Sequence, residues 1–518
     1  MNELTDPGSR WHRSLWTVAL VTILDEVIEV TEHTWSGVLN SEHALNDLKA
    51  SARRACERDH GLGSETLRKK VLEDINGIKP NDNPSSQNAI LRMHQWRDRI
   101  ARNYLRNWAS YIEDQSLEAK DVELCARSIV THLRSLGYSR SHLQGWVENR
   151  SQSLSLSELI REAARNLNGN EREYVFVVAS NELASLSNRE KKLATRDLLI
   201  EPHRFHTATN KQNFDLSILQ ASKGVEIRVA ATDPHAALAR LQLRLERIWT
   251  RFALAEGKIK QFPPSIVLET GANKLWATVD PNKLISIPAL RDWKLILALE
   301  DLDETEVLTE TLHLLSPQLQ IAHGVSLATL WASCEALLGR RQQGGHLVAP
   351  RLAAILACAY PRQLAWDLLQ RARTLKKSGT ILDCRTKGSN TQAFKDFWED
   401  IVDHDPGFSQ PEDRAAYYRF ISTIQTPKAT LKRVRNHLEE LLLRLYYHRN
   451  FVMHSAKTNS VSLSDVASVA PTIVAAAINE LISGVARGIK PSALAERAVI
   501  EMELLETDAG KPLNGLLG

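Results

Sequence analysis

Apolar residues recur at intervals of three and four over much of the first third of the chain. The segments LWTVALVTILDEVIEV, ILRMHQWRDRIARNYLRNWASYIED and AKDVELCARSIVTHLRSLGY show this spacing, which places their apolar side chains on one face of a helix. The segment NGIKPNDNPSSQN, rich in proline, asparagine and serine, predicts a loop between two of these helices. The pattern predicts a helical N-terminal domain over residues 1–155.

A second pattern begins near residue 170, where short runs rich in β-branched residues replace the helical spacing. EYVFVVAS, VEIRVAAT and KLWATVD are typical of strands. The second run ends at Thr232-Asp233-Pro234, a helix start signal, and the residues that follow have helical spacing again. We expect a small α+β module over residues 170–295, with an accessory or sensing role, in which one strand leads directly into a helix.

Helical spacing returns near residue 296 and continues through most of the remaining chain. No internal repeat of about 20 to 50 residues is present, which argues against a solenoid. The chain is therefore predicted to be mainly α, with a second helical domain over residues 300–495 and a C-terminal tail over residues 496–518.

Composition places the chain among ordinary globular proteins. Its 518 residues suffice for roughly two to four folding units, and a hydrophobic content of 43% argues against large-scale disorder. The 65 basic and 62 acidic residues give a net charge of +3, so any surface that attracts nucleic acid must be local.

Cysteine usage and the N-terminal pattern predict a cytoplasmic protein that does not enter a membrane. The five cysteines are scattered and lack Cys-x-x-Cys spacing, which argues against a disulfide framework and a zinc ribbon. The apolar run from Trp16 to Leu24 lacks the basic start and the cleavage site of a signal peptide. No segment is expected to approach the roughly 20 apolar residues of a membrane span.

The segment LLLRLYYHRNFVMHSAKT contains the candidate chemistry. The helix leading into it has an apolar stripe formed by Leu438, Leu441, Leu442, Leu445 and Val452. At about 100° per residue, Arg449 falls in the middle of this stripe. The other side of the helix carries Tyr447, Asn450, His454 and Lys457. Arg449 is therefore expected to need a polar partner, because an unpaired buried charge is costly.

Arg449 and His454 are five positions apart, which is about 140° around an undisturbed helix. The two side chains share one site only if the helix ends or bends near Asn450, or if two copies of the chain come together. Asn450 and His454 already share a face, because they are four positions apart.

Basic residues are frequent around this segment. Residues 428–457 hold seven of them against two acids, an excess of five positive charges that favours a phosphate backbone. The basic residues are Lys428, Lys432, Arg433, Arg435, Arg444, Arg449 and Lys457. Tyr446 and Tyr447 suit either stacking on unpaired bases or packing within the helical domain.

The string Arg449-Asn450-x-x-x-His454 resembles the signature of the HEPN superfamily, whose members are helical and often act as metal-independent ribonucleases. The upstream segment SLATLWASCEALLG is similar to the helix with Trp and Glu of Apea-like HEPN proteins, with Trp331 in the apolar stripe and Glu335 at its edge. The resemblance covers residues 305 to 490. It implies a helical bundle, a homodimer formed through this domain, and RNA products with a 2′,3′-cyclic phosphate and a 5′-hydroxyl.

The residues themselves suit such a reaction. His454 can remove the proton of a ribose 2′-hydroxyl, because imidazole titrates near neutral pH. Arg449 supplies a permanent cation for the phosphate, and Asn450 would orient one of the two. Candidate substrate-binding residues are Tyr447, Lys457, Arg444 and Glu335, the last of which either pairs with Arg449 or is simply exposed. No metal and no other cofactor is expected.

Two functions follow from these expectations. The first is an endoribonuclease. By analogy with large bacterial HEPN proteins, it acts in anti-phage defence or as a toxin. It is expected to stay inactive until triggered, and its regulator is either a phage-derived molecule or an antitoxin. The second is a non-catalytic scaffold that binds RNA or protein. No G-x-x-x-x-G-K-[ST] motif is present, which removes intrinsic nucleotide hydrolysis.

Overall fold

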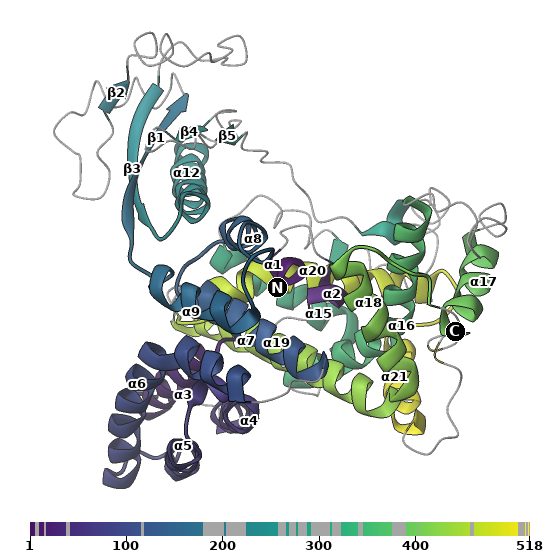
Figure 1. The fold of residues 1–518 in the computed structure, drawn as a ribbon, viewed down its shortest axis with the longest axis horizontal. Coiled ribbons are helices and arrows are strands. Elements are labelled where there is room, and N and C mark those ends of the chain that lie inside the picture. The colour runs from purple at the N-terminus through teal and green to yellow at the C-terminus, as the bar shows by residue number, and fades with distance from the viewer. Residues whose placement is uncertain are drawn as a thin grey trace.

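The protein is mainly α, with one small sheet that, together with helix α12 (Pro234–Glu256), projects from the helical domains (Figure 1). The computed structural model describes the greater part of the chain. The described residues are 1–5, 10–14, 17–37, 42–114, 119–179, 201–203, 224–256, 266–268, 276–277, 287–291, 311–312, 323–339, 345–374, 390–403, 405–455, 460–505, 513 and 516.

The N-terminal part is a helical domain, as its apolar spacing predicts. Its helices are α1 (Asn2–Thr5), α2 (Trp11–Ser14), α3 (Leu20–Trp35), α4 (Glu42–Arg58), α5 (Glu65–Gly77), α6 (Pro84–Asp114), α7 (Ala119–Ser135), α8 (Arg140–Glu148) and α9 (Leu156–Asn166). Helix α3 runs through the core and buries Leu24 and Val27 completely. Serine side chains accept hydrogen bonds from the first backbone N–H groups of α5, α8 and α9, which fixes where these helices begin.

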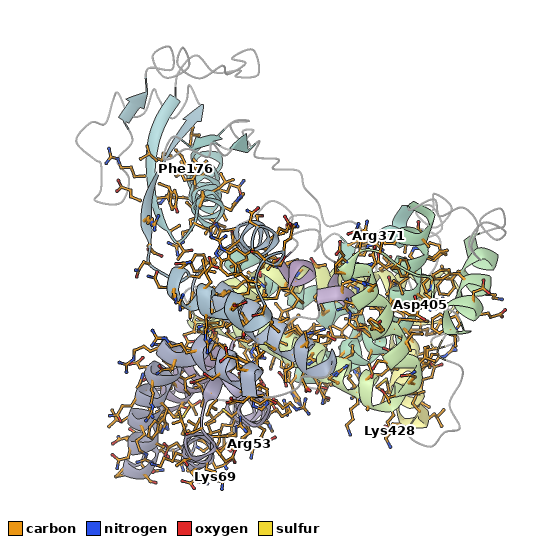
Figure 2. All side chains as sticks on the ribbon, viewed as in Figure 1. Arg53, Lys69, Phe176, Arg371, Asp405 and Lys428 are labelled. Atoms are coloured by element: carbon orange, nitrogen blue, oxygen red, sulfur yellow. The ribbon has the colours of Figure 1, made fainter. Side chains whose placement is uncertain are left out.

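The small sheet lies between the two helical parts of the sequence. Its strands are β1 (Arg172–Ala179), β2 (Glu201–His203), β3 (Gly224–Ala231), β4 (Ile266–Leu268) and β5 (Trp276–Ala277), in the order β2-β3-β1-β4-β5 with antiparallel pairing. Helix α12 (Pro234–Glu256) covers one face, where Phe176 and Leu241 are fully buried (Figure 2).

Strand β3 leads directly into α12 through Asp233, as the sequence predicts. The Asp233 carboxylate accepts hydrogen bonds from the backbone N–H groups of His235 and Ala236, which caps the helix. It also accepts from the backbone N–H of Ser139 at 2.7 Å, at the start of α8. One capping residue thus attaches the sheet to the N-terminal helices.

The C-terminal part is a second helical domain. Its main helices are α15 (His323–Leu338), α16 (Val348–Thr374), α17 (Asn390–Asp403), α18 (Pro411–Gln425), α19 (Pro427–Ser455), α20 (Leu463–Val485) and α21 (Pro491–Leu504), with the short 3-10 turns η3 (Pro288–Arg291) and η5 (Gly345–Leu347). Helix α16 is buried along most of its length and contacts α18, α19, α20 and α21. It is therefore the central helix of this domain.

The predicted tail over residues 496–518 begins inside helix α21, so its boundary is wrong. Ala498 and Met502 of this helix lie in the C-terminal core. The helix ends at Leu504, which means that the helical domain continues past residue 495.

Helix α20 corrects the expectation that no segment approaches the length of a membrane span. Its residues Asp465–Val485 are long and apolar enough for one, and they are alone in this among the described residues. Two-thirds of the apolar window is buried inside the protein, and Glu480 pairs with Arg362 of α16. Helix α20 is therefore packed as a core helix.

Residues near the N-terminus are anchored in the C-terminal domain. Trp11 of α2 belongs to the C-terminal core, and Figure 1 shows α2 among the C-terminal helices. Arg13 donates hydrogen bonds to Asp367 of α16 and, at 3.2 Å, to Asp413 of α18. These three side chains are almost completely shielded from solvent, so the attachment is a buried ion-pair network.

Removing this anchor is expected to destabilise the protein strongly. Arg13→Ala removes the buried cation that joins the two carboxylates and leaves Asp367 with Arg10 and His12 and Asp413 with the half-exposed Arg371. The free energy of unfolding should therefore fall by about 1.5–3 kcal/mol in urea denaturation, the loss expected for hydrogen bonds to charged groups. Arg10→Ala is the matched control, because Arg10 contacts the same Asp367 at 3.3 Å with a half-exposed side chain. Its loss should cost less than about 1 kcal/mol. Equal effects would contradict the buried anchor.

Candidate active site

Helix α19 is shared by the two helical domains. Leu438, Leu442 and Leu445 lie in the C-terminal core, whereas Tyr447 and Phe451 belong to the N-terminal core. The helix therefore has two buried faces, and only the sector between them is left for solvent. The sequence stripe revealed just one of these faces.

The charge that is buried on α19 is Arg444, not Arg449. Its Nε lies 2.9 Å from both carboxylate oxygens of Glu26 on α3, and its Nη2 donates to Ser51 of α4 at 3.1 Å. The side chain of Arg444 is 3% exposed. The prediction that Arg444 binds substrate is wrong, because its guanidinium is used in the contact between the two domains.

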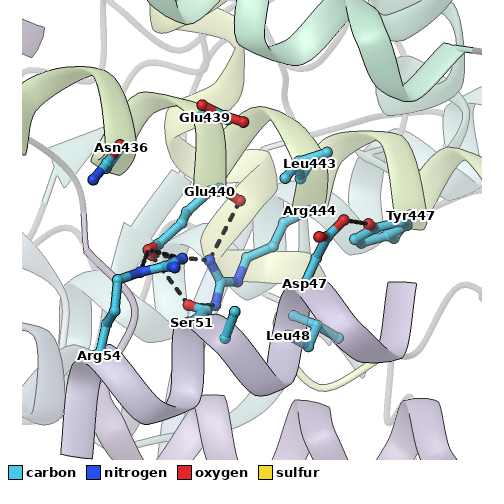
Figure 3. A pocket seen from close by; sticks show the side chains of 11 residues that line it. Asp47, Leu48, Ser51, Arg54, Asn436, Glu439, Glu440, Leu443, Arg444 and Tyr447 are labelled. Carbon is cyan, nitrogen blue, oxygen red and sulfur yellow. Dashed lines mark hydrogen bonds and ion pairs between the residues drawn. The ribbon is translucent and has the colours of Figure 1, made fainter. Parts of the chain in front are cut away.

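A small cavity of about 170 Å³ lies where α4 and α19 run side by side in opposite directions (Figure 3). Tyr447, predicted to bind substrate, lies in its wall and donates a hydrogen bond to Asp47 at 2.5 Å. Burial and this carboxylate both raise the pKa of the phenol. Tyr447 is only 4% exposed, so it packs in the domain contact and offers no face for base stacking.

Arg449 lies at the edge of the buried region, and its side chain is 28% exposed. Its guanidinium contacts Glu335 of α15 at 3.6 Å and donates to the side-chain oxygen of Asn450 at 3.0 Å. The expectation that Arg449 needs a polar partner is met by Glu335. The expected position in the middle of the apolar face is wrong, because Glu335 and solvent share this sector.

The Glu335 carboxylate is enclosed by the neighbouring turn η5. A side chain at Gly345 would collide with this carboxylate and would lie 3.1 Å from the ring of Tyr446. Trp331, one turn before Glu335, is fully buried, and its ring centroid is 5.4 Å from that of Tyr446. The Trp and Glu of α15 therefore support the Arg449 end of α19 from one side.

Helix α19 does not end near Asn450. It continues to Ser455 and so includes the backbone of His454. One of the two expected routes for bringing Arg449 and His454 together, an end of the helix near Asn450, is therefore excluded. The side chain of His454 and the whole of Lys457 lie outside the described residues.

The basic residues of the α19 region do not surround Arg449. Lys428, Lys432 and Arg433 are exposed, but they lie at the beginning of α19, and Figure 2 shows Lys428 at the outer edge of the molecule. At 1.5 Å per residue, Arg433 is about 24 Å from Arg449 along the helix. Arg444 is neutralised by Glu26, so among the described residues the exposed members of the predicted basic patch lie at the beginning of α19, away from Arg449.

A buried polar network, which the sequence analysis missed, lies on the opposite side of α19 from Arg449. The Nε2 atom of His448 lies 3.0 Å from the hydroxyl of Ser462, which donates to Glu26. Burial and the nearby Arg444 lower the pKa of His448 to about 3. Two signals were present in the sequence: His448 follows Arg444 by four positions, and Glu26 interrupts an apolar run.

Comparison of the chain with known protein families, with curated proteins and with solved structures found no match in any of the three. Among the described residues, no group of three or more histidine, cysteine or acidic side chains could hold a metal ion. The site must therefore be interpreted from its own geometry.

Truncating the two arginines should separate a structural role from a functional one. Arg444→Ala leaves Glu26 buried without a cation and is expected to lower the free energy of unfolding by about 3–5 kcal/mol. Arg449→Ala removes a partly exposed pair and should cost less than about 1 kcal/mol. Urea denaturation of both variants tests this ranking, and a larger loss for Arg449→Ala would overturn it.

His448 should make stability depend on pH. Its ordinary pKa is 6.5, so below this pH the unfolded chain binds a proton that the folded protein excludes down to about pH 3. Stability therefore falls as pH drops below 6.5, and lowering the pH from 7.5 to 5.5 should cost about 1.4 kcal/mol through this residue.

Denaturation of the His448→Gln variant at both pH values measures this loss, which should disappear from its pH dependence. The matched control is His94→Gln, the same substitution at an exposed residue of α6 outside this buried network. A pH dependence that stays the same in His448→Gln would show that His448 is not the group responsible.

Proposed function

We propose that the protein is a metal-independent endoribonuclease of the HEPN type. The observation that carries this proposal is the state of Arg449, a partly exposed guanidinium held by Glu335 and Asn450 at the end of a long helix. Arg444, five positions earlier, is buried in contacts with Glu26 and Ser51, whereas the side chain of Arg449 stays 28% exposed and so accessible to a ligand. A fixed, accessible guanidinium is suited to a phosphate, whose geometry it matches.

The proposed reaction needs a base and a cation. His454 takes the proton from the ribose 2′-hydroxyl, and the 2′-oxygen attacks the adjacent phosphorus. Arg449 stabilises the charge that grows on the phosphate oxygens. Glu335 positions Arg449, and Asn450 fixes the guanidinium through its side-chain oxygen. The products are a 2′,3′-cyclic phosphate and a 5′-hydroxyl.

A homodimer through the C-terminal domain is part of the proposal. In one chain, Arg449 and position 454 lie about 140° apart on a continuous helix. Met453, in the same turn, is 61% exposed and offers an apolar contact for a second copy. Pairing two copies would place the arginine of one beside the histidine of the other.

The biological role proposed is that of a cytoplasmic effector in anti-phage defence or of a toxin. The N-terminal domain and the sheet would then restrain the site and sense a phage-derived signal or an antitoxin. Support comes from the position of α3 and α4, which cover one face of the helix that bears the motif.

A non-catalytic scaffold that binds RNA or protein is the second candidate. It is favoured by the continuity of α19, which keeps the two motif residues on different faces of one chain. In that case Arg449 would contribute to binding and His454 would have no chemical role.

RNA cleavage in the presence of EDTA distinguishes these functions. The wild-type protein should cleave total RNA or tRNA without metal, whereas His454→Ala and Arg449→Ala should lose at least about 10²-fold in rate through loss of proton transfer or charge stabilisation. Light scattering should show that both variants keep the mass of a dimer. Equal cleavage by the wild type and His454→Ala would exclude the proposed site, and cleavage lost only on chelation would indicate a metal enzyme.

A further inference from the structure

Two histidines from different parts of the chain stack on each other, and one of them follows Gly345, which lies against the Glu335 partner of Arg449. His43 lies in the first turn of α4, and His346 is the middle residue of η5. Their ring centroids are 5.7 Å apart and their planes differ by 12°. His43 is exposed and His346 partly buried, so the stack is open to solvent on one side.

The helical rotation of α19 shows which sector this stack borders. Counting about 100° per residue from Arg449, Tyr446 lies at about 60° and Asn450 at about 100°. Position 454 follows at about 140°, and Tyr447 at about 160°. Asn450 thus lies near the middle of the sector between Tyr446 and Tyr447, and Arg449 lies just outside this sector, beyond Tyr446.

The two elements that carry the histidines border this sector, with η5 at the Tyr446 edge and α4 at the Tyr447 edge. Tyr446 packs against Gly345, the residue before His346. On the other edge, Tyr447 binds Asp47, one turn after His43. Because α4 and α19 run in opposite directions, the start of α4 lies level with the end of α19 (Figure 3). The two elements that hold the stack, η5 and the start of α4, therefore border the sector that contains Asn450.

We propose that His346 is a second catalytic residue of the ribonuclease site, the proton donor to the leaving 5′-oxygen. This inference rests on the proposed function and adds a group that the Arg449–His454 motif lacks. While His454 accepts the 2′-hydroxyl proton and the 2′-oxygen bonds to phosphorus, the bond from phosphorus to the 5′-oxygen breaks. The imidazolium of His346 gives its proton to that oxygen, so one proton is gained and one lost by the protein.

The assignment to His346 rather than to His43 follows from how each residue is held. The backbone at Gly345 lies against the Glu335 carboxylate, whose other oxygen contacts Arg449. His346 is therefore linked to the phosphate-binding cation through one carboxylate. His43 is attached only through α4 and the ring contact, so it is a positioning residue that fixes the plane of the His346 ring.

This arrangement gives the N-terminal domain a direct part in the site. Residue 43 comes from α4, which is fixed to α19 by Arg54 and Glu440 at 2.7 Å and by the Asp47–Tyr447 hydrogen bond. A second copy of the chain is not needed for the acid, although it remains the proposed source of the opposing His454. Displacing α4 would separate His43 from His346 and slow the reaction without unfolding the C-terminal domain.

A substrate with an activated leaving group tests the role of His346. On RNA, His346→Ala should lower kcat about 10²- to 10³-fold, because the 5′-alkoxide is a poor leaving group without a proton. On uridine 3′-(4-nitrophenyl phosphate), the leaving 4-nitrophenolate needs no proton. The kcat of His346→Ala on this substrate should therefore fall by less than about tenfold, because general-base catalysis is retained. His94→Ala, an exposed histidine on α6, is the control and should match the wild type on both substrates.

Variants of His43 separate stacking from proton transfer. His43→Phe keeps an aromatic ring beside His346 and should retain most activity on RNA, whereas His43→Ala should be slower. If His43→Phe is as slow as His346→Ala, His43 would be the acid and the assignment fails. An equal loss on both substrates for His346→Ala, or no loss, would also overturn it. Failure of the ribonuclease proposal itself would appear differently, as absence of EDTA-resistant cleavage by the wild type.

Discussion

The buried ion pair between Glu26 and Arg444 is the constraint on which the arrangement of the two helical domains depends. Neither charge can stay buried alone, so α3 and α19 must dock in a register that brings them within hydrogen-bond distance. Ser51 and Ser462 complete the polar shell around the pair. This register turns Arg444 and His448 toward the N-terminal domain, and Arg449, on the opposite side of the helix, toward Glu335.

Because α19 contributes to two cores, the free surface of its C-terminal half is limited to a narrow sector. A helix buried on one face alone could accept a partner along its whole length. Near the end of α19 the cores meet Tyr447 on one side and Leu445 on the other, and the turn around Asn450 and Met453 faces outward. The phosphate or the second chain that we propose would therefore approach the protein at this turn.

Local sequence spacing predicted the helices, the strands and the passage from β3 into α12, because these depend on neighbours within a few residues. The HEPN resemblance placed Trp331 in the apolar stripe and left Glu335 either paired with Arg449 or exposed; in the structure Trp331 is buried and Glu335 contacts Arg449. Local spacing did not predict the burial of Arg444, because a helical wheel shows which residues share a face but not which element covers that face. The partner, Glu26, lies 418 positions earlier in the chain. The same limit hid the stack of His43 and His346.

Each helical domain contains a helix from the other end of the chain, and this affects folding during synthesis. Helix α2 is fixed in the C-terminal core, while α19 completes the N-terminal core. At usual translation rates, roughly 20 to 80 s separate the emergence of Glu26 from that of Arg444. During this interval the nascent N-terminal helices expose an unneutralised carboxylate and an unfilled apolar groove. The N-terminal core is therefore expected to be completed only after the α19 segment has been synthesised, which is the slow folding expected of contacts so far apart in the chain.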